Sequence, residues 1–139
     1  GVDGSPVSRQ CFDLAYHFAR PGDLVRVVHV DDTDHAVTHQ ASNFEMIGSS
    51  AIGKYYTDLC AKSASMKDGV SFRYEALPKK GSIKETLLLA ADQEDCCADL
   101  FILGSIELTQ PHKDVYLGSV SAAVAKRTPA HTLIAKHFA

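Results

Sequence analysis

Apolar runs alternate with amphipathic stretches along the whole chain. The segment LVRVVHV, residues 24–30, is almost continuously apolar and β-branched, which is typical of a strand covered on both faces. Before it, apolar residues recur at three- and four-residue spacing and predict a helix that begins at Ser5-Pro6 and ends at Pro21-Gly22. Ser5 suits the N-cap of this helix, and Pro6 suits its first position, where a missing N–H costs nothing.

The rest of the chain continues this alternation. An amphipathic stripe from Phe44 to Leu59 predicts a second helix, and the strict alternation over residues 70–76 predicts a half-exposed edge strand. Ser82 suits the cap of a third helix. The last three expected elements are a strand over 100–103, a helix that opens at Gly118-Ser119 and stops at Pro129, and a strand over 132–135.

This order predicts an α/β fold in which right-handed helical crossovers join parallel strands. We expect a doubly wound, open, parallel five-stranded sheet, order 3-2-1-4-5, with helices on both faces. Val2 to Ser5 look like the exit from a buried first strand, yet only Gly1 and Val2 of that strand are present. We therefore expect that residues upstream of Gly1 belong to the fold, or that the sheet is incomplete in this sequence.

Composition fits one domain over residues 1–139. Apolar residues make up 45% and charged residues 22%, as in ordinary globular proteins, and the length is sufficient for a full core. The net charge of −3 gives no support to a nucleic-acid-binding face. No segment approaches the roughly 20 apolar residues of a membrane span. We expect a cytoplasmic protein with neither nucleic acid nor membrane as a partner.

Cysteine and histidine positions do not predict a metal site. The cysteines lack the paired spacing of a zinc site and are expected to be reduced, partly buried thiols: Cys11, Cys60, Cys96 and Cys97. A redox role for the adjacent Cys96 and Cys97 is left open. His35 and His39 lie in a predicted loop without a third ligand, and His29, inside an apolar strand, is expected to be a hydrogen-bonded core residue.

Three segments should meet beyond the carboxyl ends of the strands, where open parallel sheets bind ligands. They are residues 3–5, residues 30–32, and the segment from Gly104-Ser105 to Ser121. Small residues allow backbone N–H groups to approach an anion closely, and a helix N-terminus at Gly118-Ser119 favours phosphate. The sequence therefore predicts an anion site at this edge, without a nucleophile paired to a base; we assign no catalytic residue.

Several segments resemble the universal stress protein family. LFILGS and YLGSVSAAVAKRTPAHTLIAK are similar to that family's C-terminal signature, and VDGSPVSRQCFDLAYHFA and VRVVHV to its opening helix and second strand. The resemblance implies an adenine nucleotide, either ATP or AMP/ADP, with Mg²⁺ if a polyphosphate is bound. The residues that it assigns to the nucleotide, together with the adjacent loop serine, are Asp3, Val30, Gly104, Ser105, Gly118, Ser119, Val120 and Ser121.

The phosphate motif departs from the family pattern at its second glycine. Glu107 stands there, and ten residues rather than nine separate it from Gly118. At about 5 Å and an effective dielectric of about 20, one carboxylate–phosphate charge pair costs roughly 3 kcal/mol. Lys113, protonated His112 or a metal ion would offset this repulsion. AMP or ADP is therefore more plausible here than with an intact motif.

The resemblance also implies a homodimer that forms through the last strand, His131 to Lys136, which should be a sheet edge. Two alternatives remain. One is a nucleotide-free interaction protein of the same fold, which the altered motif at Glu107 favours. The other is an enzyme on a related nucleotide-binding scaffold, although the chain has neither an SGG-x-DS loop nor an H-x-G-H motif.

Overall fold

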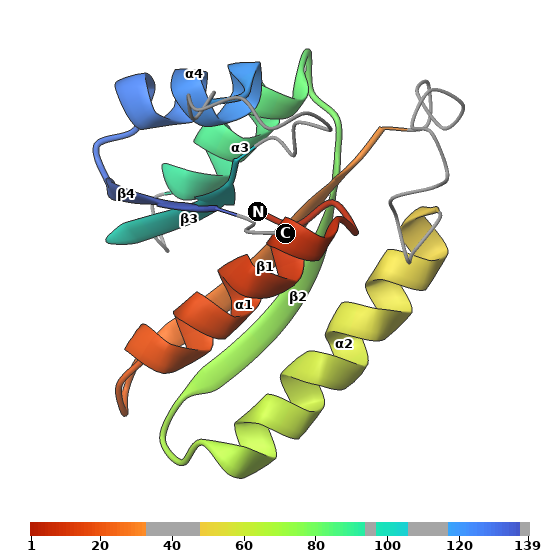
Figure 1. Cartoon of the computed structure of the whole chain (residues 1–139), viewed down its shortest axis with the longest axis vertical. Coiled ribbons are helices and arrows are strands. Elements are labelled where there is room, and N and C mark those ends of the chain that lie inside the picture. Colours follow the sequence, from red (N-terminus) through yellow and green to blue (C-terminus); the bar gives the residue numbers. More distant parts are fainter. Residues whose placement is uncertain (33–47, 94–96, 106–116, 137–139) are drawn as a thin grey trace.

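Helices and strands alternate in the order that the sequence predicts (Figure 1). The structure, a computed structural model, describes residues 1–32, 48–93, 97–105 and 117–136. In this part of the chain the elements are α1 (Pro6–Phe18), β1 (Leu24–Asp31), α2 (Ser49–Met66), β2 (Ser71–Pro78), α3 (Ile83–Ala91), β3 (Leu100–Gly104), α4 (Ser119–Arg127) and β4 (His131–Ala135). Phe44, at the start of the predicted second stripe, lies outside the described residues.

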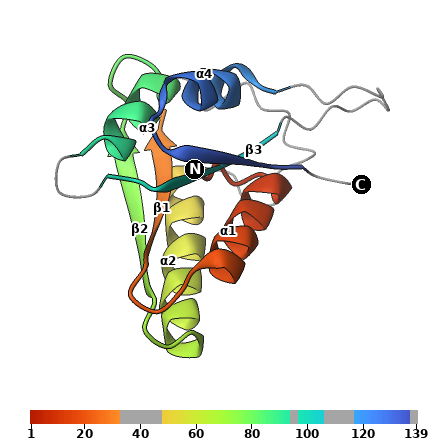
Figure 2. The same ribbon diagram turned by 90° about the vertical axis from the view of Figure 1, so that its left-hand side faces the viewer.

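The strands pair in parallel, as predicted, but in two separate pairs. β1 pairs with β2 from Leu24↔Ser71 to Asp31↔Pro78, and β3 pairs with β4 from Leu100↔His131 to Gly104↔Ala135. Within the described residues the single five-stranded sheet that we expected is not formed. The two pairs run in clearly different directions in both views (Figures 1 and 2).

The first two residues lie between the two strand pairs. The N–H of Val2 donates to the carbonyl oxygen of Val28 in β1 at 2.8 Å. The amino group of Gly1 donates to the carbonyl oxygen of Ile102 in β3 at 3.0 Å. Two residues are too few to form a strand, so these contacts join β1 to β3 at one point only.

Helices cover both faces of β1, as predicted, because its successive side chains point to opposite sides. Val27 packs with Phe12 of α1 and Tyr56 of α2 in one hydrophobic cluster. Val28 packs with Val124 of α4, and with residues of α3 and β3, in a second cluster. Tyr56 and Val124 are fully buried, so solvent is excluded from the centre of each cluster.

Short polar segments begin the helices. The Ser5 side chain accepts the N–H of Ser8 at the start of α1, and Ser82 forms a reciprocal capping box with Glu85 at the start of α3. Cys11 and Cys60 are free and buried, whereas Cys97 is free and exposed; Cys96 lies outside the described residues. No helix in the described ranges has both the length and the apolar character to cross a membrane.

Candidate functional site

The turn after Val2 brings Asp3 beside the start of α1. Asp3 Oδ1 accepts three hydrogen bonds: from the N–H of Ser5 at 3.0 Å, from Ser5 Oγ at 2.5 Å and from Ser8 Oγ at 2.7 Å. The N–H of Asp3 in turn donates to Ser8 Oγ at 2.9 Å. Gly4 makes this compact turn with φ of 86°, a value that side-chain-bearing residues rarely adopt.

This network determines the charge of Asp3. Partial desolvation of the carboxylate favours its neutral form, but the hydrogen bonds from Ser5 and Ser8 outweigh that effect and lower the pKa of Asp3. The residue is nonetheless exposed to solvent. The carboxylate's hydrogen bonds within the described residues all involve Oδ1, so Oδ2 of the ionised group is the atom that can receive a hydroxyl donor from a ligand.

His29 connects the end of β1 to the start of α2. Its Nδ1 lies 2.9 Å from the carbonyl oxygen of Val2 and therefore donates to it, and its Nε2 lies 3.3 Å from Ser49 Oγ. Ser49 Oγ donates to Asp31 Oδ1 at 2.7 Å. In a catalytic triad the carboxylate would bond the imidazole instead. His29 is thus the hydrogen-bonded core histidine that we expected, and its exposed fraction is 8%.

Gly104 and Ser105 end β3 in a closely packed corner. A Cβ on Gly104 would lie 2.7 Å from Val7 Cγ1, so this position has no room for a side chain. Ser121 Oγ donates to the Gly104 carbonyl oxygen at 2.8 Å, and the N–H of Ser105 donates to Ala135 at 2.8 Å. The family resemblance assigns Gly104 to the nucleotide motif, and its contact with Val7 of α1 gives a packing reason for glycine at the same position.

The N-terminus of α4 lies directly after this corner. Gly118 is its N-cap and makes no side-chain capping bond, in contrast to Ser5 and Ser82 at α1 and α3. Ser119 is exposed and Val120 is partly buried in the second cluster. The first-turn N–H groups of α4 therefore lack a side-chain acceptor among the described residues, and the positive end of the helix dipole is free to attract an anion.

Several predicted features lie outside the described residues: Glu107, His112, Lys113, His35 and His39. Sequence reasoning missed one pair at the same edge, Lys79 Nζ and Asp32 Oδ1, which lie 2.7 Å apart. The sequence contained a signal for this pair, because Asp32 and Lys79 each directly follow one of two strands that pair in parallel. The described residues contain no group of three or more His, Cys, Asp or Glu side chains that could hold a metal ion.

The geometry thus joins Asp3, Val30 and the β3–α4 corner only in part. Asp3 follows the residues that bridge β1 and β3, and Ser121 ties the start of α4 to the end of β3. Val30 is buried near the carboxyl end of β1. The arrangement offers one carboxylate oxygen and a set of helix N–H groups, which can bind a polar ligand that carries an anionic group.

Comparison with known proteins gives consistent results. The sequence model of the universal stress protein family matches residues 1–136. A solved structure described as universal stress protein UspA from Lactobacillus plantarum is similar in fold, with a TM-score of 0.68 and 19% sequence identity over 96% of this chain and 92% of that chain. No match was found among curated protein sequences.

Proposed function

The chain belongs to the universal stress protein family, and from this premise we propose that it binds an adenine nucleotide at the carboxyl ends of β1 and β3. Binding would make it a nucleotide-responsive stress protein rather than an enzyme. The observation that carries the proposal is the N-terminus of α4, which lacks a capping side chain and is fixed to the end of β3 by the bond from Ser121 to Gly104.

Each part of the nucleotide would contact a different segment. Phosphate would accept the N–H groups of Ser119, Val120 and Ser121, because the Ser121 hydroxyl proton is already donated to Gly104. Ribose hydroxyls would donate to Asp3 Oδ2. The backbone of Val30 would meet the adenine edge. The N–H of Ser71 donates to the carbonyl oxygen of Asp23, which shows that the backbone N–H and C=O groups of odd-numbered residues in β1 face β2. Those of even-numbered residues, including Val30, therefore face away from β2.

We further infer that the two strand pairs are the halves of one five-stranded sheet of order 3-2-1-4-5, with a first strand between β1 and β3. The bonds of Gly1 to Ile102 and of Val2 to Val28 support this order. Such a sheet would place all the candidate binding residues at one edge, at the point where strand order reverses.

We also propose a homodimer through the outer edge of β4. In the described residues β4 pairs on one side with β3 and lies at the end of its sheet. The N–H of His131 donates to the carbonyl oxygen of Asp99, and the carbonyl oxygen of Ala135 accepts from the N–H of Ser105. The backbone N–H and C=O groups of odd-numbered residues in β4 therefore face β3. The backbone of Thr132 and Ile134 therefore faces outward, where it can pair with a second copy.

Calorimetric titration with AMP, ADP and ATP, each with and without Mg²⁺, tests nucleotide binding. Ser119→Glu places a carboxylate in the first turn of α4, and Ser119→Gln is its neutral match at an exposed position. At a separation of about 5 Å the added charge should weaken binding roughly a hundredfold, while the glutamine variant binds like the parent. If none of the three nucleotides gives a measurable heat of binding, the proposal is wrong.

A nucleotide-free interaction protein is the second candidate. It is favoured by the fact that Asp3 Oδ1 and the Ser121 hydroxyl are already bonded within the protein. Denaturation of the purified protein followed by chromatography of the released small molecules separates the two candidates. Release of a stoichiometric adenine nucleotide would exclude this second one.

A further inference from the structure

Four residues near the proposed nucleoside contacts form a chain of polar contacts, which we call the His29 chain: Val2, His29, Ser49 and Asp31. His29 Nδ1 lies 2.9 Å from the carbonyl oxygen of Val2, and His29 Nε2 lies 3.3 Å from Ser49 Oγ. Ser49 Oγ lies 2.7 Å from Asp31 Oδ1. The chain therefore links the N-terminal segment, β1 and the first residue of α2 through one imidazole.

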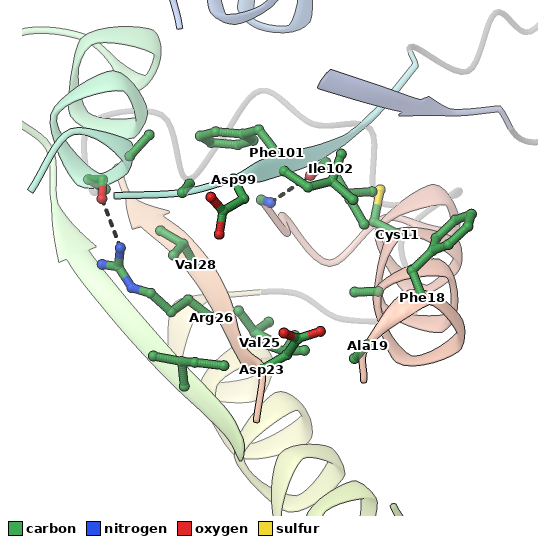
Figure 3. A pocket seen from close by; sticks show the side chains of 18 of the residues that line it. Cys11, Phe18, Ala19, Asp23, Val25, Arg26, Val28, Asp99, Phe101 and Ile102 are labelled. Atoms are coloured by element: carbon green, nitrogen blue, oxygen red, sulfur yellow. Dashed lines mark hydrogen bonds between the residues drawn. The ribbon is translucent and has the colours of Figure 1, made fainter. Parts of the chain in front are cut away.

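The imidazole lies on the face of β1 that α1 and α2 cover. Side chains of a strand alternate between its two faces. Val28 belongs to the hydrophobic cluster beneath α3 and α4, whereas Val25 packs against the cluster of α1 and α2; Figure 3 shows both side chains. His29 is odd-numbered like Val25, and it is buried. Its two ring nitrogens must therefore find their hydrogen-bond partners within the protein.

His29 joins the two segments that would hold the nucleoside. On one side, the imidazole donates to the peptide group just before Asp3, the proposed ribose contact. On the other side it reaches Asp31 through Ser49, and Asp31 directly follows Val30, the proposed adenine contact. The position of one side chain thus affects both proposed contacts.

The chain lacks one proton when His29 is neutral. A neutral imidazole that donates through Nδ1 has an accepting Nε2 without a proton. The Ser49 hydroxyl carries one proton, and at 2.7 Å Asp31 Oδ1 is its nearer acceptor. Nε2 and Ser49 Oγ then face each other with no proton between them. A proton on Nε2 would be donated to Ser49 Oγ, and every contact in the chain would become a hydrogen bond.

The charges around His29 favour uptake of this proton. Asp31 lies at the end of the chain, and the charge of Asp3 interacts with that of His29. Asp32 is even-numbered and belongs to the opposite face, where it pairs with Lys79 at 2.7 Å. Because imidazole is more basic than a carboxylate, the added proton would reside on His29 rather than on Asp31.

Other titratable groups that interact with Asp3 or Asp31 come from α1, α2, β2 and the N-terminus. Burial raises the pKa of Cys11 to about 11 and also raises the pKa values of Tyr56 and Tyr74, so these three groups stay neutral at neutral pH. Burial lowers the pKa of the Gly1 amino group. That group is present in every variant compared below, so its titration cancels in the comparison.

We propose that His29 positions the nucleoside half of the site, and that a proton taken up by its imidazole completes the His29 chain and strengthens nucleoside binding. This inference rests on the proposed nucleotide function and adds its regulation. The completed chain would hold both contact segments and the start of α2 in one arrangement before the ligand arrives, which lowers the ordering cost of binding. Histidine side chains change charge between about pH 5 and pH 8, so affinity should rise as the pH falls through this range.

Adenosine is the probe for this coupling, because a nucleotide's phosphate would itself titrate near about pH 6. Calorimetry at about pH 5.5 and about pH 7.5 should show that the parent binds adenosine at least about fivefold more tightly at the lower pH. Ser49→Ala interrupts the chain and should bind with equal affinity at both pH values. Two controls should keep the parent's ratio: Ser50→Ala, which removes an exposed hydroxyl from the same turn, and His17→Gln, which removes an exposed histidine of α1.

Hydrogen exchange without ligand tests the His29 chain itself. The N–H of Ile52 donates to the carbonyl oxygen of Gly48 at 3.2 Å in the first turn of α2, where no side chain caps the helix. After correction for the intrinsic pH dependence of exchange, Ile52 in the parent should be at least about fivefold more protected at the lower pH. In Ser49→Ala its protection should not depend on pH.

The same pH dependence in the parent and in Ser49→Ala, for either adenosine affinity or Ile52 protection, would overturn the proposal. If the parent binds adenosine equally well at both pH values, the coupling is wrong but the proposed function stands. If neither adenosine nor any of the three nucleotides binds at either pH, the proposed function is wrong, and the role of His29 in binding fails with it.

Discussion

At the end of β3, a single glycine contacts two helices. Gly104 packs against Val7 of α1, and its carbonyl oxygen accepts a hydrogen bond from Ser121 of α4. A residue that looks like part of a ligand loop in the sequence thus also fixes the positions of two helix starts. Both helix starts border the candidate site, so packing at Gly104 and ligand binding should be coupled.

Gly104→Ala should lower the free energy of unfolding by about 1–3 kcal/mol, because its Cβ overlaps Val7. Gly53→Ala in α2 is the matched control: its Cβ would meet Tyr74 at an ordinary 3.5 Å, and alanine should stabilise the helix by about 0.5–1 kcal/mol. Urea unfolding measures both. If Gly104→Ala is as stable as the parent, the corner is looser than the structure indicates.

Asp3 predicts a specific pH dependence. Its folded-state pKa is lowered, so its carboxylate adds stability above the unfolded pKa of about 3.9, and this stability is lost as the pH falls through the folded value. Asp3→Asn should therefore be less stable at neutral pH, by about 1 kcal/mol. Its stability should also fall less between about pH 5 and pH 2. Parallel curves for parent and variant would contradict this account.

At the scale of elements, the individual helices and strands are the part that the sequence predicts best, because their signals are local. Ser5-Pro6 and Ser82 begin helices as expected, and the strands start within a residue or two of the expected positions. The position of the β1–β2 pair relative to the β3–β4 pair could not be predicted in the same way, since it depends on a first strand of which only Gly1 and Val2 are present.

The candidate site was predictable to a similar extent. Its position at the strand ends follows from topology, and the exposed start of α4 follows from Gly118-Ser119. What the sequence could not show is how its polar atoms are used. The bonds of Asp3 to Ser5 and Ser8 and the contact of Gly104 with Val7 depend on three-dimensional packing.

The capping box of α3 should contribute measurably to stability. Ser82→Ala removes the acceptor for the Glu85 N–H, now 3.2 Å from Ser82 Oγ, and should cost about 1 kcal/mol. Ser65→Ala is a suitable control, because that exposed hydroxyl bonds a carbonyl oxygen in the last turn of α2 rather than an N–H. The difference between their urea midpoints gives the result; equal midpoints would show that the cap is dispensable.

For the whole molecule, the proposed homodimer depends on the outer edge of β4. Thr132→Pro removes a backbone N–H that faces away from β3, whereas the hydrogen bonds between β4 and β3 use odd-numbered residues of β4. The monomer should therefore still fold, and the dissociation constant of the dimer should rise at least about tenfold. Thr132→Val keeps that N–H and removes only a buried hydroxyl without a partner among the described residues. Sedimentation velocity of both variants tests this; an undiminished dimer in Thr132→Pro would exclude the β4 edge.

The aromatic residues are distributed unevenly between the two hydrophobic clusters. The chain has no tryptophan, and its four described tyrosines all belong to or pack against the cluster between α1, α2 and β1: Tyr16, Tyr55, Tyr56 and Tyr74. The cluster beneath α3 and α4 contains none of them. In intrinsic ultraviolet fluorescence these four tyrosines will therefore report on the half of the molecule around α1, α2 and β1. The fifth tyrosine, Tyr116, lies outside the described residues in the segment between β3 and α4, so loosening around the β3–α4 corner would have to be followed through Tyr116 or through an introduced fluorophore.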